Sequence, residues 1–560
     1  MFYETFTIKW LTKFARQIPA VNRVSQNAFA SGMENGIFLC RLYPEGMKTN
    51  LIIFVLSLLF AGTLFSQVTN IQIGVAGDWP NEPAICMNPA NTGQIVIGVN
   101  PDQYYLSDDG GATWQHGILT SSFGVNCDPV IVAGNDGNFY YFHLVPNLSR
   151  VVCQKMEGFQ PPWSDGSYTA VYNSYDIDKE WAVYDPVHDN LYTSWTRFNN
   201  WGSSSPTDST DIFISKSTDG GASWGDQKLV SNIGGNATGG FGSVHGSYPA
   251  TGPNGEVYVA WWSPAGLMFD RSLDEGETWL GTDINVTGFP VQWIVSIPGI
   301  QTGVSFPVIA CDRSGGPANG TIYINWTDRR GAQGDANIWL VKSTDGGNTW
   351  SEPKKVNDDA SVTHQFFNFI TIDQVTGKIY VIFYDRRNYT NANTDVYLAI
   401  SDDGGETFAN HKISETSFIP FSTVFFGHYI GVVAHNDKVF ATWMRMDEGE
   451  LTLWGAPIDP TTVGKEPGKA IPLSLTQNTP NPFRENTFFS FKLESTSAVT
   501  LLVTDLFGKT VATIISNKKM SPGKHVVSFS PEKWDLPSGM YHYSLVTDHK
   551  TVTKKMVYAR

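Results

Sequence analysis

The chain has 560 residues, more than one ordinary globular domain holds, so we expect two or more domains. It is rich in glycine (53), proline (30) and aromatic residues (13%), and only 16% of its residues are charged. This composition favours short strands joined by turns and disfavours helical bundles, coiled coils and disordered tails. The formal net charge of −15 argues against nucleic acid as a partner, since nucleic-acid binding needs a basic face.

The N-terminal region has the pattern of a secretory signal peptide. A charged stretch at Met47 leads into a short apolar run that fades at Phe65. This run is short for a membrane span, and no later run is long enough either. We therefore expect an unstructured, over-extended start over residues 1–46, a signal peptide over residues 47–66, and no transmembrane segment in the mature chain. The alternative is a cytoplasmic extension before a membrane anchor.

Cysteine usage after the signal peptide is sparse. Export places the mature chain in oxidising surroundings, but only Cys86, Cys127, Cys153 and Cys311 remain. Four cysteines in a chain of this length do not make a disulfide scaffold, although one or two disulfides of unspecified pairing are compatible with it. There is no CxxC pair and no Cys/His cluster, so the sequence predicts no metal site and no cofactor.

An octapeptide of consensus S-x-D-x-G-x-[ST]-[WF] recurs five times. Successive copies start 110, 55, 71 and 58 residues apart, and the double first spacing predicts a degenerate copy near residues 163–167. Repeats of this length indicate a propeller or solenoid. The consensus positions are occupied by Ser107, Asp109, Gly111 and Trp114; Ser217, Asp219, Gly221 and Trp224; Ser272, Asp274, Gly276 and Trp279; Ser343, Asp345, Gly347 and Trp350; and Ser401, Asp403, Gly405 and Phe408.

The octapeptide has a structural rationale that requires no ligand. Its aspartate is expected to accept hydrogen bonds from the backbone of its own turn. Its glycine permits a positive φ, and its closing aromatic residue packs into the core. We interpret the motif as a hairpin staple without a catalytic role.

Strand-like runs precede each octapeptide in a fixed order. A run that begins near a proline or aromatic residue is followed by a run rich in Tyr and Trp, such as residues 190–195 and 256–261. With the strands that enter and leave the octapeptide, each unit has four strands, which is the pattern of a β-propeller blade. Unit starts near residues 82, 128, 180, 248, 306, 367 and 428 predict an all-β propeller over residues 67–458. Seven blades are favoured over six, with residues 69–75 completing the last blade.

These repeats resemble the Asp box, or BNR repeat, of the sialidase/neuraminidase superfamily. The resemblance covers roughly residues 68–460 and implies a propeller fold. It also implies three arginines that hold a sialic acid carboxylate, a Tyr/Glu nucleophile pair and an Asp acid/base. The first of these arginines belongs to an (F/Y)-R-I-P motif, but the matching stretch here, residues 81–84, carries Glu82 instead. Whether the chain is an enzyme stays open; if it is, the resemblance implies a sialidase-like glycoside hydrolase.

Strand direction predicts which residues share a face. In an antiparallel four-strand blade, the start of strand 1 and the end of strand 2 lie at one face, and the octapeptides lie at the other. A rim of carboxylates, arginines and aromatic residues, with Trp262 and Tyr384 nearby, suits a polar, saccharide or anionic ligand. The alternative is that the Asp-Arg pairs only bridge adjacent blades. The candidate ligand-binding residues are Glu82, Asp128, Glu180, Arg197, Asp328, Arg329, Arg330, Asp385, Arg386, Arg387, Tyr429 and Arg445.

The C-terminal region reads as a linker over residues 459–472 and a small β-sandwich over residues 473–560, similar to an immunoglobulin-like module. This region closely resembles the type A sorting domain of Bacteroidetes type IX secretion. The resemblance rests on four segments in order: Leu475–Phe483, the turn Asp505–Gly508, Leu536–Tyr541 and residues 554–556. This resemblance implies transfer across the outer membrane by the type IX machinery, and then release or surface attachment.

The sequence therefore predicts a secreted or cell-surface propeller that binds or processes glycans or glycoproteins. Two alternatives stay open: a true exo-sialidase, and a non-catalytic scaffold that binds proteins.

Overall fold

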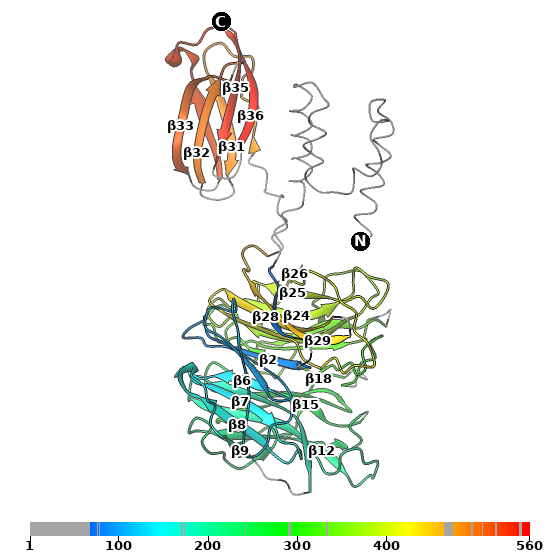
Figure 1. The fold of residues 1–560 in the computed structure, drawn as a ribbon. Coiled ribbons are helices and arrows are strands. Elements are labelled where there is room, and N and C mark those ends of the chain that lie inside the picture. The colour runs from blue at the N-terminus through cyan, green and yellow to red at the C-terminus, as the bar shows by residue number, and fades with distance from the viewer. Residues whose placement is uncertain are drawn as a thin grey trace, which may run out of the picture. The chain divides into compact units, whose positions relative to one another are not determined.

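The computed structural model describes residues 68–559, apart from positions 76, 78, 170–171, 173, 241, 289–292, 332–333, 448, 464–473, 494–496, 507, 521–522 and 548–550. These residues form two compact units, which are described one after the other. The N-terminal unit extends to residue 463, and the C-terminal unit starts at residue 474 (Figure 1). The predicted over-extended start and signal peptide lie outside the described residues. None of the helices in the described part is both long and apolar enough to cross a membrane.

The N-terminal unit consists of seven antiparallel sheets. The first four sheets, in hydrogen-bonded order, are β2 (Asn81–Met87), β3 (Ile95–Asn100), β4 (Gln103–Ser107) and β5 (Gln115–Ile118); β6 (Val130–Ala133), β7 (Phe139–Leu144), β8 (Val151–Met156) and β9 (Ser167–Thr169); β10 (Asp176–Asp185), β11 (Asn190–Phe198), β12 (Ser209–Ser217) and β13 (Lys228–Leu229), with β14 (Gly235–Asn236) also on β12; and β15 (His245–Thr251), β16 (Val257–Ser263), β17 (Gly266–Ser272) and β18 (Ile284–Thr287).

The other three sheets are β19 (Val308–Cys311), β20 (Ile322–Asp328), β21 (Asn337–Ser343) and β22 (Lys354–Lys355); β23 (Gln365–Ile372), β24 (Ile379–Asp385), β25 (Asp395–Ser401) and β26 (Ala409–Lys412); and β27 (Gly431–His435), β28 (Lys438–Asp447), β29 (Glu450–Ile458) and β1 (Ile71–Gly74). The 3₁₀ turn η2 (Glu157–Phe159) follows β8.

The first strands of the seven sheets contact one another in a closed cycle. In chain order β2 contacts β6, β6 contacts β10, and so on through β15, β19, β23 and β27, which returns to β2. The N-terminal strand β1 pairs with β29 of the last sheet, as predicted for residues 69–75. Because that sheet contains both ends of the unit, hydrogen bonds close the ring.

The repeated second strands explain the aromatic excess of the composition. In five units the predicted second run ends with an aromatic residue that is at most 1% exposed. These residues are Trp195, Trp261, Trp326, Phe383 and Trp443. Each places a large ring between neighbouring sheets, where burial of an aromatic side chain contributes most to the core. The predicted repeat of this strand therefore corresponds to a repeated layer of the core.

The octapeptides form the turns between the third and fourth strands, as expected. In all five copies the Ser hydroxyl donates to the Asp carboxylate, and the Gly N–H donates to the Ser oxygen. The seventh residue donates both its N–H and its hydroxyl to the same carboxylate. These bonds lower the pKa of four of the five carboxylates to about 2, hydrogen bonds from the Thr being the main cause.

The degenerate copy near residues 163–167 occupies the same position, between β8 and β9, but its bonding differs. Asp165 accepts hydrogen bonds from the Ser122 N–H and hydroxyl, at 2.7 and 2.6 Å, rather than from its own turn. This copy therefore fastens a loop of the preceding sheet.

The C-terminal unit is built from two antiparallel sheets around one core. They are β30 (Ser474–Leu475), β31 (Thr487–Leu493) and β34 (Gly523–Phe529), and β33 (Thr510–Met520), β32 (Ser497–Thr504), β35 (Gly539–Val546) and β36 (Thr551–Tyr558), with the 3₁₀ turn η3 (Pro531–Trp534).

The motif segment that begins this unit has structural roles. Asn478 is buried, and its side-chain amide donates to the Pro480 carbonyl and the Thr487 hydroxyl. Its backbone N–H donates to the Tyr543 hydroxyl at 2.8 Å, and Phe483 is buried in the core. These residues tie the entering chain to both sheets.

Candidate ligand-binding face

The first strands of the sheets begin at one face of the N-terminal unit, and several have a residue in the left-handed region at or near their start. Glu82 (φ 52°), Asp128 (φ 57°), Lys179 (φ 52°) and Phe367 (φ 51°) adopt this conformation, which is uncommon outside glycine. Gly246 (φ 69°) occupies the equivalent place in β15. Such residues concentrate at functional sites when the surrounding structure holds them. The repeated kink places the charged side chains of three sheets close together.

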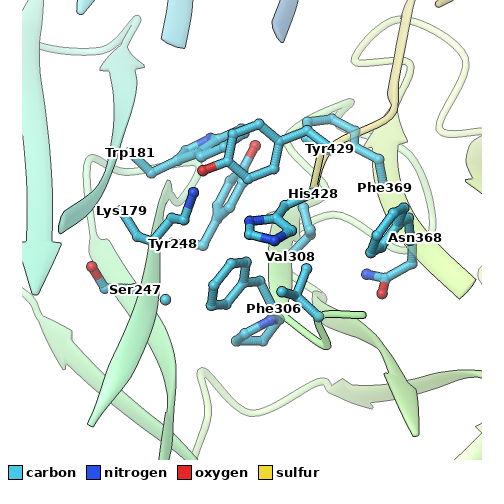
Figure 2. A pocket seen from close by; sticks show the side chains of 14 residues that line it. Lys179, Trp181, Ser247, Tyr248, Phe306, Val308, Asn368, Phe369, His428 and Tyr429 are labelled. Carbon is cyan, nitrogen blue, oxygen red and sulfur yellow. The ribbon is translucent and has the colours of Figure 1, made fainter. Parts of the chain in front are cut away.

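A buried cluster of charges lies at the centre of this face. The Lys179 Nζ atom lies 3.3 Å from Glu82 Oε1 and 3.1 Å from Asp128 Oδ1. The His428 Nδ1 atom lies 3.0 Å from Glu82 Oε1. The ammonium group also lies over the Tyr429 ring, 4.8 Å from its centroid. The cluster therefore joins the first three sheets to the last one. Figure 2 shows Lys179, His428 and Tyr429 of this cluster.

Burial and attraction set the protonation of the cluster. Burial alone would raise the pKa of Glu82, but Lys179 and His428 outweigh it and hold that pKa far below its usual value. Burial, together with repulsion by Glu82, raises the pKa of Asp128 well above its usual value, although Lys179 opposes this. Burial would lower the pKa of Lys179, but the two carboxyl groups outweigh it and raise that pKa. The attraction between the Lys179 ammonium group and the Glu82 carboxylate therefore favours the charged form of both groups.

Glu180 belongs to the same region but is fully buried. Burial, and then repulsion by Asp128, raises its pKa well above the usual value of a glutamate. Burial therefore favours its neutral, protonated form.

The pocket above the cluster is small. It is lined by Lys179, Phe306, Phe367, His428 and Tyr429 among others, and its volume is about 30 Å³ (Figure 2). This space accommodates one or two water molecules and no sugar ring. A larger ligand would therefore have to bind on the open surface above the pocket.

A series of aromatic rings runs through this face, with His245 buried in its middle. Trp201 contacts His245 at 6.3 Å between centroids, and His245 contacts Phe306 at 5.3 Å. Phe306 contacts His428 at 6.3 Å, and His428 contacts Phe425 at 4.9 Å. The two ends of the series face solvent, since Trp201 is 42% and Phe425 39% exposed.

The structure does not bring the predicted arginines to the buried carboxyl groups of Glu82 and Asp128; two of them pair with the predicted aspartates of their own turns. Arg330 Nε bonds Asp328 at 2.7 Å, two residues away in its own turn. Arg387 bonds Asp385 in the same way, at 2.8 Å, and also reaches Asp358. The repeated Asp-x-Arg sequence thus forms internal pairs in two sheets, because residues i and i+2 meet where the strand ends.

The other arginines have separate surroundings. Arg197 bonds Asp211 and packs on Phe213, and Arg445 bonds Thr416 and packs on Trp454. Arg329 is exposed and donates to the Gly334 carbonyl.

Arg386 and two of the predicted aromatic residues are buried. Arg386 donates to Thr394 and the Pro298 carbonyl, and burial lowers its pKa to about 10. Trp262 and Tyr384, expected near the site, donate to backbone carbonyls in the core, so they are structural residues. Of the candidate residues, the structure brings together Glu82, Asp128, Glu180 and Tyr429.

Sequence reasoning missed Lys179, His428 and the aromatic series. Lys179, rather than Glu180, occupies the left-handed position of its strand that Glu82 and Asp128 occupy in theirs. The bulge between Asp178 and Trp181 in β10 recurs between Asn81 and Ala84 in β2, so Lys179 is the residue of β10 that is equivalent to Glu82. The signal that could have revealed Lys179 is its charge at the start of a repeated first strand.

Two family models match the chain. "Secretion system C-terminal sorting domain" matches residues 479–559, and "BNR/Asp-box repeat" matches residues 105–116. No curated protein matches.

Among solved structures, the similar ones are distant. A protein of unknown function from Dyadobacter fermentans is 11% identical with a TM-score of 0.41, covering 71% of this chain and 98% of that one. The Hadza microbial sialidase Hz136 is 12% identical with a TM-score of 0.37, covering 66% and 74%. An α-L-arabinanase from Penicillium chrysogenum is 12% identical with a TM-score of 0.37, covering 60% and 98%. The two family matches, rather than these distant structures, characterise the chain: it carries a BNR/Asp-box repeat and a sorting domain that directs export to a secreted or cell-surface location.

Proposed function

We propose that this chain is an exported seven-bladed β-propeller that binds glycans or glycoproteins at the face described above. The type IX machinery would be the partner of its immunoglobulin-like C-terminal domain. The observation that carries the proposal is the aromatic series from Trp201 to Phe425, with both ends exposed over a charged centre. Aromatic rings offer flat apolar surfaces to the faces of sugar rings, and nearby polar groups orient them.

The charge cluster favours neutral glycans over sialosides. A sialic acid carboxylate needs a cation that is not already neutralised, but Lys179 is paired with Glu82 and Asp128. Glu82 also stands where the resemblance to sialidases implies an arginine. The 30 Å³ pocket excludes a sugar ring from the cluster. These observations support binding without sialoside hydrolysis.

A protein-interaction scaffold is the second candidate function. Its support is an apolar loop between β26 and β27, where Ile419 and Phe421 are exposed beside Phe425. Contiguous exposed apolar side chains are typical of protein-binding surfaces.

A glycan array and a fluorogenic sialoside assay, both on the mature full-length chain, separate these functions. Binding on the array without sialoside turnover is the expected result. Sialoside hydrolysis would establish the sialidase and contradict our proposal. No response in either assay would leave the scaffold as the better account.

A further inference from the structure

A second cavity lies on the other side of the N-terminal unit, inside the ring of first strands. Its volume is about 320 Å³, and all seven first strands contribute to its lining. Trp181, Tyr248 and Phe369 line both this cavity and the small pocket of the opposite face. Their rings lie 4.5 to 6.0 Å apart between centroids, so they separate the two spaces. The cavity is therefore a blind channel whose floor is aromatic.

The channel is open because its wall consists of small side chains. Side chains of a strand alternate in direction, so the residue two positions after each floor residue also faces the channel. At this level six residues remain partly exposed although they lie within the innermost strands. They are Cys86, Val132, Val183, Ala310, Thr371 and Val433. Small, mostly apolar side chains do not reach across the ring, and they leave an apolar tube.

The mouth of the channel carries a cation. Arg313 follows the end of β19 and lines the cavity. Its guanidinium group donates to the Thr251 hydroxyl at 2.5 Å, and its backbone N–H donates to Gln374 at 2.7 Å. Within the described part of the chain Arg313 forms no ion pair. The carboxylate of nearby Asp185 lies 2.8 Å from His188 instead.

This arrangement is what an amphipathic anion requires. A guanidinium group keeps its charge and offers several donors in one plane, which matches a carboxylate. A cation that is largely removed from water and lacks an ion-pair partner is costly, and an incoming anion would relieve that cost. An apolar tube below a single cation suits a carboxylate with a hydrocarbon body.

We propose that the channel is a binding site for a small organic acid, with its carboxylate on Arg313 and its apolar body against the ring of small side chains. The aromatic floor separates this site from the proposed glycan-binding face, so the two proposals stand or fall independently.

Isothermal titration of the mature full-length chain with hexanoate and hexanamide tests the proposal. We expect hexanoate to bind at one saturable site and hexanamide at least tenfold more weakly, because the amide lacks the charge. Butanoate should bind more weakly than hexanoate, by about fourfold for each methylene that is buried.

Variants locate the site. Arg313→Gln should weaken hexanoate at least tenfold, whereas Arg313→Lys should retain most of the binding. Arg271→Gln is the matched control, because Arg271 lies outside the channel and bonds the Gly346 carbonyl and Asn348. Ala310→Phe should block the channel. Absence of saturable hexanoate binding, equal binding of hexanamide, or unchanged binding by a folded Arg313→Gln or Ala310→Phe variant would overturn the proposal.

Discussion

The buried ammonium group of Lys179 provides the strongest test of how the ring of sheets is held. Lys179→Met keeps most of the side-chain volume and removes the charge. At an effective dielectric constant of about 20, attraction across 3.1 and 3.3 Å is roughly 5 kcal/mol for each carboxyl partner if that partner is ionised. The cost of removing the charges from water offsets much of this attraction.

The loss of folding free energy in Lys179→Met depends mainly on the buried carboxyl groups that lose their cationic partner. Without Lys179, the buried Glu82 carboxylate keeps His428 and the Asn100 side-chain amide, which donates to it at 2.6 Å, as polar neighbours. Removing one partner of a buried ion pair typically costs about 3–5 kcal/mol, and we expect a loss in that range. Glu82→Gln combined with Lys179→Met should recover part of the loss, since the uncompensated charge is then absent.

Urea-induced unfolding at pH 7 measures the change in unfolding free energy. Variants are compared with the wild type where their m-values are equal. Lys155→Met is the matched control, because Lys155 pairs at 3.5 Å with the largely exposed Glu157. We expect this surface substitution to cost less than about 1 kcal/mol. A similarly small loss for Lys179→Met, or no recovery in the double variant, would refute the reasoning.

Three further predictions concern the Asp boxes and a buried carboxyl group. Gly111→Ala should destabilise the fold strongly, because the added Cβ would lie 2.0 Å from a Phe440 ring atom. Gly110→Ala should lower the free energy of unfolding less, because its Cβ would have no atom within 4 Å. Equal losses of unfolding free energy for the two variants in chemical unfolding would contradict this prediction. The Asp-box carboxylates, with pKa values near 2, should contribute stability at neutral pH that is lost as the pH falls from about 4 to 2, as acid titration followed by circular dichroism would show. Burial raises the pKa of Asp270 to about 7, so its ionisation should destabilise the fold as the pH rises from about 4 to 7. The melting temperature of Asp270→Asn should therefore rise relative to that of the wild type as the pH increases over this interval. A difference in melting temperature that does not change with pH would contradict the raised pKa of Asp270.

Much of the fold was predictable because the local pattern repeats. The octapeptide bonds itself within eight residues, so its turn follows from its own side chains, as Ser107 and Asp109 show. The second strands repeat their aromatic residues, which marks the same core layer in each unit. Even the completion of the last sheet by β1 followed from counting strands.

The site was less predictable because it depends on register and on contacts between sheets. Lys179, rather than Glu180, is the residue of β10 that aligns with Glu82 across the bulge that both first strands share, and a bulge leaves little trace in sequence. The predicted joint rim of arginines and carboxylates does not form, because Arg330 and Arg387 are satisfied by aspartates of their own turns. The approach of Trp201 to His245 joins two sheets, and no local pattern indicates it.

The central claim is that the exposed aromatic residues of this face bind glycans. The direct test is titration of the strongest array glycan into the wild type, Trp201→Ala and Trp534→Ala. Trp534 is the matched control, since it is 41% exposed in the C-terminal unit and Trp201 is 42% exposed. Loss of one stacking ring should weaken binding about tenfold or more in Trp201→Ala and leave Trp534→Ala unchanged. Equal affinity of all three proteins would contradict the account.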